Sequence, residues 1–352
     1  MSDRAPRLPL ETDLPIVAAP MAGGPTTVAL ARAVSAAGGL PFLAGGYTAP
    51  AALADEVAQL AGDGAPFGVN LFVPSDAAVD LDAFRAYAAE LQPEAEPYGV
   101  RLDPEPVTDD DAWGAKLALL LEHPVPFVSF TFDLPPADDV ARLRRAGTVV
   151  LGTVTTPDEA VAARDAGVDA LVVQGPAAGG HSATFDPGRP AGTLAAAGGA
   201  AAGTAELVAA VVASAGLPVV AAGGVDGPGA VRDLLAAGAQ AVAVGTLLLR
   251  TDEAGTSPVH RAALADPRFE RTVVTRAFTG RPARALENGF TRMHDAAAPV
   301  GYPAVHHLTR SLRRAAAAAG DADRVHLWAG TGYRSAAEGP AGDVVRALAA
   351  AL

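Results

Sequence analysis

The chain has 352 residues, half of them hydrophobic, and its 39 acidic residues outnumber 26 basic ones, so the formal net charge is −13. This length suits one large α/β domain with a subdomain, and the acidic balance argues against nucleic acid or an anionic membrane as a partner. Cysteine is absent and Lys116 is the only lysine, which excludes disulfides and thiolate chemistry and disfavours Schiff-base catalysis. The stretch 1–17 lacks the basic start and apolar core of a signal peptide, so we expect a soluble, cytoplasmic protein.

Eight short apolar runs follow one another along the chain, separated by longer, mostly alanine-rich stretches. Each run is continuous rather than alternating, as in strands that are buried on both faces of a parallel sheet. The predicted strands are Ile16–Ala19, Leu40–Leu43, Phe67–Leu71, Phe127–Phe130, Val149–Leu151, Ala170–Val173, Val219–Ala222 and Ala241–Val244. Eight strands with helices between them predict a (β/α)8 TIM barrel. An open doubly wound sheet is the alternative, but the chain has neither a G-x-G-x-x-G after its first strand nor a G-x-x-x-x-G-K-[ST] loop.

The intervening segments carry helix start and stop signals. The clearest is Thr156-Pro157-Asp158-Glu159, which offers an N-cap, a proline at the first helical position and a glutamate three residues after the cap. This helix should run to Ala166, with Gly167 in the left-handed conformation that ends many helices.

Two regions depart from the alternation of strands and helices. Residues 93–111 are rich in proline and acids and are expected to form an extended connection within the barrel. Residues 251–323 contain no obvious parallel strand and many arginines, so we expect a helical lid subdomain there. The predicted domains are thus the barrel at 1–250, the lid at 251–323 and a C-terminal segment at 324–352 that returns to the barrel.

In a barrel of this kind, catalytic groups follow the carboxyl ends of the strands. After the sixth strand comes Q-G-P-A-A-G-G-H-S-A-T, residues 174–184, in which Gly179 and Gly180 precede His181. Glycines let the backbone approach a ligand closely, and histidine is the side chain whose pKa lies nearest neutrality. The loop therefore resembles an active-site loop, although a surface loop with a solvated histidine has the same composition.

The turns after the seventh and eighth strands also contain glycine. They are Gly223-Gly224 and Ala243-Val244-Gly245-Thr246. TIM barrels often bind a phosphate at these two turns, through backbone N–H groups and a helix N-terminus, and this requires no lysine. Tight turns into the next helix would use the same glycines, but the two turns together favour a cofactor that carries a phosphate.

Taken together, these motifs resemble the nitronate monooxygenase family, formerly called 2-nitropropane dioxygenase. The resemblance rests on Ala19-Pro20-Met21, Asn70-Leu71-Phe72, the loop 174–184, the two phosphate turns, and a weaker echo at 327–332. It implies an FMN-dependent barrel enzyme in which His181 is catalytic. It also implies that the flavin is contacted by Met21, Asn70, Gln174, Gly179, Gly180, Gly223, Gly224, Ala243, Val244, Gly245 and Thr246. Family members often have glutamine at the position of Thr331 and an acidic residue near Ala177-Ala178, and these departures bear on the substrate.

The function implied by this resemblance is the oxidation of alkyl nitronates, with nitroalkanes as further substrates, by dioxygen to carbonyl compounds and nitrite. His181 would act as a base or would orient the anion. Two alternatives remain open, an FMN-dependent NAD(P)H reductase of the enoyl-ACP or quinone type and a barrel that binds FMN or a phosphate without catalysis. We expect no metal site, because His306, His307 and Asp295 are isolated and resemble lid-surface residues. The sequence is compatible with a homo-oligomer.

Overall fold

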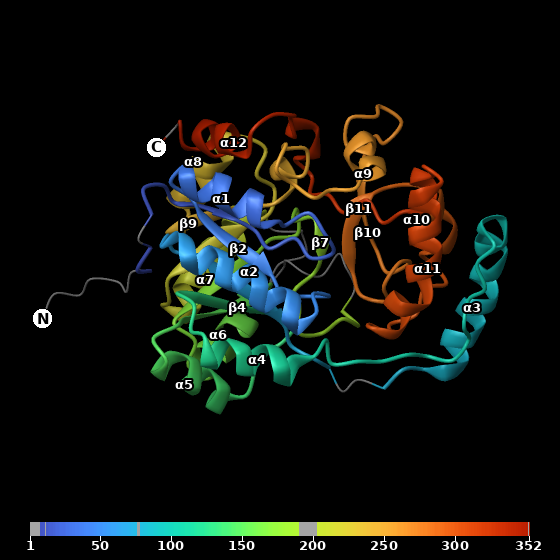
Figure 1. The fold of residues 1–352 in the computed structure, drawn as a ribbon, viewed down its shortest axis with the longest axis horizontal. Helices are drawn as coiled ribbons and strands as arrows, with labels where there is room; N and C mark the ends of the chain where they lie inside the picture. The colour runs from blue at the N-terminus through green and yellow to red at the C-terminus, as the bar shows by residue number, and fades with distance from the viewer. Residues whose placement is uncertain (1–7, 11, 76–77, 190–202, 351) are drawn as a thin grey trace, which may run out of the picture.

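The computed structural model describes residues 8–10, 12–75, 78–189, 203–350 and 352. Eight parallel strands close into a barrel in the order β1-β2-β3-β4-β5-β6-β8-β9, and β9 pairs again with β1 (Figure 1). The strands are β1 (Ile16–Ala18), β2 (Leu40–Ala44), β3 (Gly68–Phe72), β4 (Phe127–Thr131), β5 (Val149–Val154), β6 (Ala170–Gln174), β8 (Val219–Ala222) and β9 (Ala241–Val244). Each begins within one residue of its predicted start. The (β/α)8 TIM barrel is therefore confirmed.

A layer of helices surrounds this barrel. It consists of α1 (Val28–Ala36), α2 (Pro50–Asp63), α4 (Trp113–Glu122), α5 (Ala137–Arg145), α6 (Pro157–Asp165), α7 (Thr204–Ala215), α8 (Pro228–Ala236) and α12 (Ala341–Ala349). The C-terminal α12 packs between α1 and α8, so it completes the ring after the last strand. The predicted start of α6 is confirmed, because the Thr156 hydroxyl accepts a hydrogen bond from the Glu159 amide at 3.1 Å. Gly167 ends the helix with φ of +88°.

A second body of structure covers one end of the barrel. After η3 (Thr246–Leu248), the chain forms α9 (Pro258–Ala263), β10 (Thr272–Thr275), β11 (Ala283–Leu286), α10 (Gly289–His294), α11 (Ala304–Ala318) and η4 (Ala322–Arg324). This segment combines helices with long loops, and it also contributes an antiparallel sheet in the order β10-β11-β7, in which β7 is Gly180–His181. The chain then returns through η5 (Tyr333–Ser335) to α12. The domain boundaries at 250 and 323 stay a prediction.

The region expected to connect elements within the barrel has a different structure. Helix α3 (Leu81–Ala95) continues through Pro93 into η1 (Glu96–Tyr98) and packs against α11, far from the barrel (Figure 1). The expectation of an extended connection from residue 93 was therefore wrong for its first residues. Phe84, Tyr87 and Leu91 share one face of α3 and are buried in a core with Phe278 and the lid. This burial outweighs the cost of a proline in the last helical turn.

The barrel interior and the helix layer hold most of the buried apolar side chains, while the lid has its own core around Phe278 and Phe290. Among the described residues, no helix is both long and apolar enough to cross a membrane.

Candidate active site

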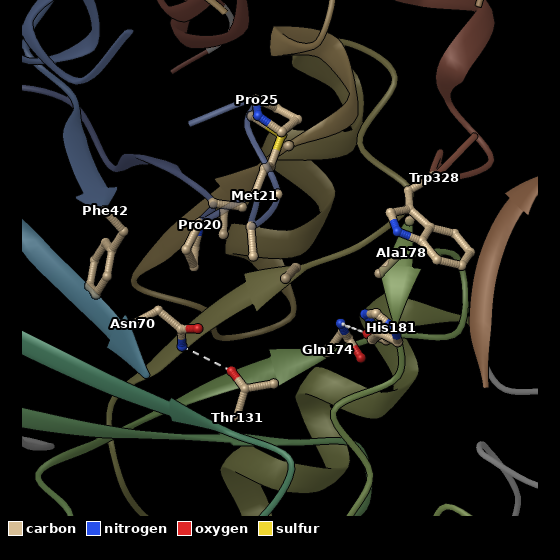
Figure 2. A pocket seen from close by; sticks show the side chains of 18 of the residues that line it. Pro20, Met21, Pro25, Phe42, Asn70, Thr131, Gln174, Ala178, His181 and Trp328 are labelled. Atoms are coloured by element: carbon tan, nitrogen blue, oxygen red, sulfur yellow. Dashed lines mark hydrogen bonds between the residues drawn. The ribbon is translucent and has the colours of Figure 1, made fainter. Parts of the chain in front are cut away.

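A cavity of about 680 Å³ lies at the carboxyl ends of the barrel strands, between the barrel and the lid (Figure 2). Its volume falls in the range of sites that enclose small molecules and cofactors. All the residues that the sequence predicted for the site line it. They are Met21, Asn70, Gln174, Gly179, Gly180, His181, Gly223, Gly224, Ala243, Val244, Gly245 and Thr246. The structure thus brings the predicted residues together around one space.

Gln174 holds the loop that carries His181. It ends strand β6, and its side-chain amide donates to the His181 carbonyl at 3.0 Å while its oxygen accepts from the Ala183 amide at 2.8 Å. His181 in turn pairs with Ala283 of β11, so it lies in the sheet that joins the barrel to the lid. Both polar ends of the Gln174 side chain are therefore used to fix the histidine loop.

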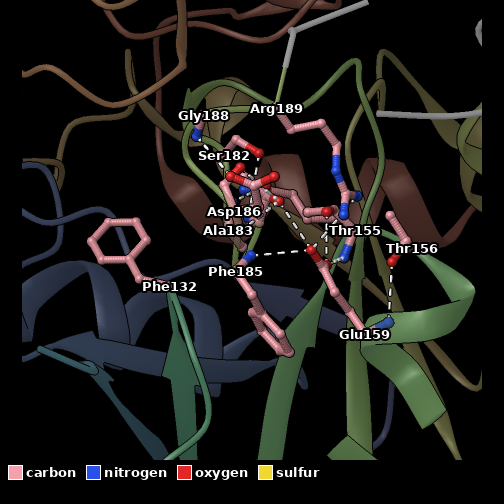
Figure 3. Close-up of polar contacts among 12 residues, drawn as sticks. Phe132, Thr155, Thr156, Glu159, Ser182, Ala183, Phe185, Asp186, Gly188 and Arg189 are labelled. Atoms are coloured by element: carbon pink, nitrogen blue, oxygen red, sulfur yellow. Dashed lines mark hydrogen bonds and ion pairs between the residues drawn. The ribbon is translucent and has the colours of Figure 1, made fainter. Parts of the chain in front are cut away.

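The backbone that follows His181 lies between the carboxylate of Glu159, labelled in Figure 3, and the guanidinium of Arg281. The buried carboxylate of Glu159 accepts from the Thr184 hydroxyl at 2.9 Å and the Phe185 amide at 3.1 Å, and its other oxygen accepts from the Thr155 amide and hydroxyl. From the lid, the buried Arg281 guanidinium donates to the carbonyls of Ser182 and Thr184. An anion that accepts and a cation that donates thus fix this segment from both sides.

The ring of His181 contacts the lid directly. Its Nε2 lies 3.0 Å from the hydroxyl oxygen of Thr279, and that hydroxyl donates to the Arg281 carbonyl at 3.3 Å. Because the hydroxyl hydrogen is used there, we assign Nε2 as the protonated nitrogen and Nδ1 as the one with a free lone pair. Within the described part of the chain, Nδ1 has no hydrogen-bond partner.

His181 is neutral at physiological pH. Burial, together with the positive charges of Arg281 and Arg313, lowers the pKa of His181 to about 3. Aromatic rings surround the imidazole, with the ring centroids of Trp328, Phe132 and Tyr302 at 5.3, 5.7 and 5.7 Å. The imidazole therefore carries no permanent positive charge, and it can accept a proton at Nδ1 only as a weak base.

The two glycine turns follow the neighbouring strands β8 and β9, and each lies close to another loop of the site. A Cβ on Gly223 would approach the Ala178 amide nitrogen to 2.9 Å, and both Gly223 and Gly224 have positive φ. Thr246, at the start of η3, accepts from the Gly330 amide at 2.9 Å, and its own hydroxyl hydrogen has no acceptor among the described residues. The turns therefore keep a donor available at the mouth of β9.

Asn70 presents an acceptor to the same cavity. Its buried amide nitrogen donates to the Thr131 hydroxyl at 2.9 Å, as Figure 2 shows, and to the Ser129 hydroxyl, also at 2.9 Å. These bonds fix the amide, and its oxygen has no donor among the described residues. An N–H group of a ligand ring would satisfy that oxygen.

The weak sequence echo at 327–332 also reaches the site. Trp328, Gly330 and Gly332 line the cavity, and the Thr331 amide donates to the Ala177 carbonyl at 3.1 Å. The described residues contain no group of three or more His, Asp or Glu that could hold a metal ion.

Comparison with known proteins identifies the family. The model of the family described as nitronate monooxygenase matches residues 9–351. The chain belongs to the nitronate monooxygenase family. It is 40% identical to a nitronate monooxygenase from Pseudomonas aeruginosa over 99% of this chain and 98% of that protein. It is 36% identical to a probable nitronate monooxygenase from Staphylococcus saprophyticus over 92% of this chain and 90% of that protein.

Solved structures agree with this assignment. A nitroalkane oxidase from Streptomyces ansochromogenes matches with a TM-score of 0.90 and 49% identity, over 97% of this chain and 96% of that chain. FabK from Thermotoga maritima matches with a TM-score of 0.72 and 26% identity, over 96% of this chain and 92% of that chain. The predicted family is therefore confirmed, and the chain is an oxidoreductase of this family.

Several cavity residues come from the lid and its neighbouring loops and were missed by the sequence reasoning. His306 was expected at the lid surface, and that expectation was wrong. It is 8% exposed, lines the cavity, and stacks on Tyr47 with ring centroids 4.4 Å apart and planes 4° apart. His306, Thr309 and Arg313 recur at helical spacing on the buried face of α11. A polar row on the buried side of an amphipathic helix was the signal that could have revealed them.

Proposed function

We propose that this protein oxidises alkyl nitronates, and more slowly nitroalkanes, to carbonyl compounds and nitrite, with FMN as cofactor and dioxygen as the final electron acceptor. The observation that carries the proposal is a neutral His181, whose Nδ1 lone pair has no partner among the described residues, at a cavity bordered by the glycine turns at Gly223 and Gly245. Family membership supports the reaction class.

The residues present suit FMN. The free hydroxyl hydrogen of Thr246 and the backbone of Gly223, Gly224 and Gly245 would hold the phosphate. The unpaired oxygen of Asn70 would accept from a ring N–H. When bound, FMN would supply the acceptor for the substrate's electrons.

The protein's own part is to bind and orient the substrate and to move one proton. Nδ1 of His181 would take the α-proton of a neutral nitroalkane and so leave the nitronate in the cavity. A substrate that arrives as the nitronate needs no proton transfer, and the aromatic walls formed by Trp328 and Phe132 would exclude water around it. Thr279 holds the imidazole in the tautomer that this role requires.

The first test is anaerobic mixing of the purified protein with propionate 3-nitronate and, separately, with NADH and NADPH, while flavin absorbance is followed. We expect fast bleaching with the nitronate and none with the nicotinamides. Bleaching by NADH or NADPH alone would make the protein a reductase. A colourless protein that does not respond after FMN is added would remove the flavin assignment.

The second test removes the imidazole. His181→Ala should retain FMN and lose roughly two to four powers of ten in turnover of a neutral nitroalkane, the usual span for a general base. The matched control is His123→Ala, because His123 is exposed at the end of α4 and does not line the cavity. Turnover of the His181 variant at the level of this control would refute the catalytic role.

A further inference from the structure

Arg313 of α11 is a buried cation without a carboxylate partner. Arg313 is only 5% exposed to solvent, and it lines the cavity. The guanidinium donates to the His306 carbonyl at 2.9 Å and the Thr309 hydroxyl at 2.9 Å, and it lies 3.2 Å from ring nitrogens of His306 and His326. No acidic group within the described ranges forms an ion pair with it. Buried arginines are normally paired with an acid, because an uncompensated buried charge is costly.

The neighbouring imidazoles do not supply the missing charge. Burial and the nearby Arg313 lower the pKa values of His306 and His326 far below the usual range, so both rings are neutral. If Arg313 only connected α11 to the segment around His326, it would not need a charge, since a neutral amide side chain could make similar hydrogen bonds. The charge itself therefore needs an explanation.

Counting donors shows what Arg313 has left to offer. A guanidinium carries five N–H groups. The Nε hydrogen is donated to Thr309, and the two Nη2 hydrogens are donated to the ring and the carbonyl of His306. The two Nη1 hydrogens face His326, whose neutral ring has only one acceptor nitrogen. One N–H of Nη1 is therefore spare. Because His306 accepts through Nδ1, its own proton is on Nε2, and this second donor also has no partner among the described residues.

Positively charged side chains outnumber negatively charged ones around the cavity, although the whole chain has a negative net charge. Its acidic residues are Asp109, which pairs with His307 at 2.9 Å, and Asp111, which pairs with Lys116 at 2.7 Å. Its basic residues are Arg310, Arg313 and Arg314, all on α11, and none forms an ion pair with a described residue. A chain with a net charge of −13 thus places uncompensated cations on one wall of its cavity. Such an arrangement favours an anionic ligand.

We propose that Arg313 is the residue that makes this site select the anionic nitronate over the neutral nitroalkane, through its spare Nη1 hydrogen and through the proton that it keeps on Nε2 of His306. The choice of nitronate rests on the proposed function, whereas the binding of a small planar anion by this wall does not. Arg313 acts directly on the anion, and it also positions His306.

The test compares two inert ligands on the FMN-loaded protein by titration calorimetry. Nitrate has the planar shape and the charge of the nitronate group, and 2-methyl-2-nitropropane is a neutral nitro compound that has no α-hydrogen to lose. In the wild type, nitrate should bind more tightly than the neutral compound. Equal affinity, or tighter binding of the neutral compound, would overturn the proposal without any variant.

The variants separate charge from packing. Arg313→Met should weaken nitrate binding by about 10- to 100-fold, the effect of losing a charged hydrogen bond, and change the neutral ligand by less than about threefold. Arg313→Lys should recover most of the nitrate affinity. The control Arg292→Met removes an exposed arginine of α10 that does not line the cavity and should match the wild type. Equal losses for both ligands in Arg313→Met would assign Arg313 a structural role only.

These results can be distinguished from failure of the proposed function. If nitrate binding depends on Arg313 but propionate 3-nitronate does not bleach the flavin, the anion site is supported and the proposed reaction is refuted. If the nitronate is oxidised but Arg313→Met leaves its KM and the nitrate Kd unchanged, the reaction stands and the role of Arg313 falls. If Arg313→Met does not fold, Arg313→Gln still tests the proposal, since its amide keeps hydrogen-bonding groups without the charge and should weaken nitrate binding while leaving the Kd of the neutral ligand unchanged.

Discussion

Gly179 is the position at which the structure makes its sharpest prediction. A Cβ on this residue would lie 2.4 Å from the Gly330 amide nitrogen and 2.5 Å from the Ala329 carbonyl carbon. Both are backbone atoms, so neither can move away as a side-chain tip would. Gly179→Ala should therefore push the His181 loop and the segment 329–331 apart by about 1 Å, the difference from ordinary van der Waals contact.

The expected cost follows from the bonds that this separation breaks. The Gly330 amide donates to Thr246 at 2.9 Å, and the Thr331 amide donates to the Ala177 carbonyl at 3.1 Å. A shift of about 1 Å takes both beyond hydrogen-bond distance, at about 1 kcal/mol each. We expect about 2–3 kcal/mol of destabilisation and, because His181 moves with the loop, a loss of roughly 100-fold in kcat.

Thermal unfolding and steady-state kinetics with a nitronate would measure both effects. The matched control is Gly180→Ala. Gly180 has φ of +77° and open space at its Cβ position, so alanine there is strained by about 1–2 kcal/mol but separates no segments. A Gly179→Ala variant that keeps the kcat of Gly180→Ala, with an equal or higher Tm, would refute this reasoning.

Two further predictions concern buried ionisable groups. Burial lowers the pKa of His260 to about 4, so between about pH 4 and 6.5 the unfolded chain binds more protons than the folded one. The neutral, buried histidine therefore contributes about 3 kcal/mol to the unfolding free energy above pH 6.5, and this contribution is lost as the pH falls from 6.5 to 4. His260→Gln should flatten the pH dependence of the unfolding free energy by up to about 1.4 kcal/mol per pH unit, measured by urea unfolding from pH 5 to 7.5, and parallel curves would contradict it. Lys116 is 2% exposed and pairs with Asp111, whose other oxygen accepts from the Tyr47 amide. Lys116→Met should destabilise by about 2–4 kcal/mol in thermal unfolding, and the double variant with Asp111→Asn should recover part of it, whereas strictly additive losses would argue against the pair.

The barrel and its site were predictable from the sequence for a physical reason. Strands buried on both faces are continuous apolar runs, and the carboxyl ends of parallel strands must converge at one end of the barrel. Once eight such runs are placed, His181 and the turns at Gly223 and Gly245 have to lie around one space. No information from distant parts of the chain is needed for that inference.

The lid could not be predicted in the same way, because its contacts are set by packing between distant segments. The strands β7, β10 and β11 have two to four residues each and carry no clear periodicity. His306 and Arg313 look like surface residues until α11 is docked over Tyr47 and the barrel mouth. Helix propensity places these residues on one face of a helix, but only the docking of that helix determines what the face covers.

The charges in the site bear on the choice between the two substrates. Burial, and after it the charges of Arg281 and Arg313, makes His181 a weak base, since an imidazolium there would lose its hydration and lie near two buried cations. The same cations would stabilise a nitronate beside them, so the charge that proton removal creates on a nitroalkane would offset part of the cost of protonating the histidine. A substrate that is already a nitronate would be stabilised by the cations and would require no proton transfer to His181. Under the proposed function, these charges would therefore favour the anion as the better substrate, and His181 would act as a base only when the neutral compound is bound.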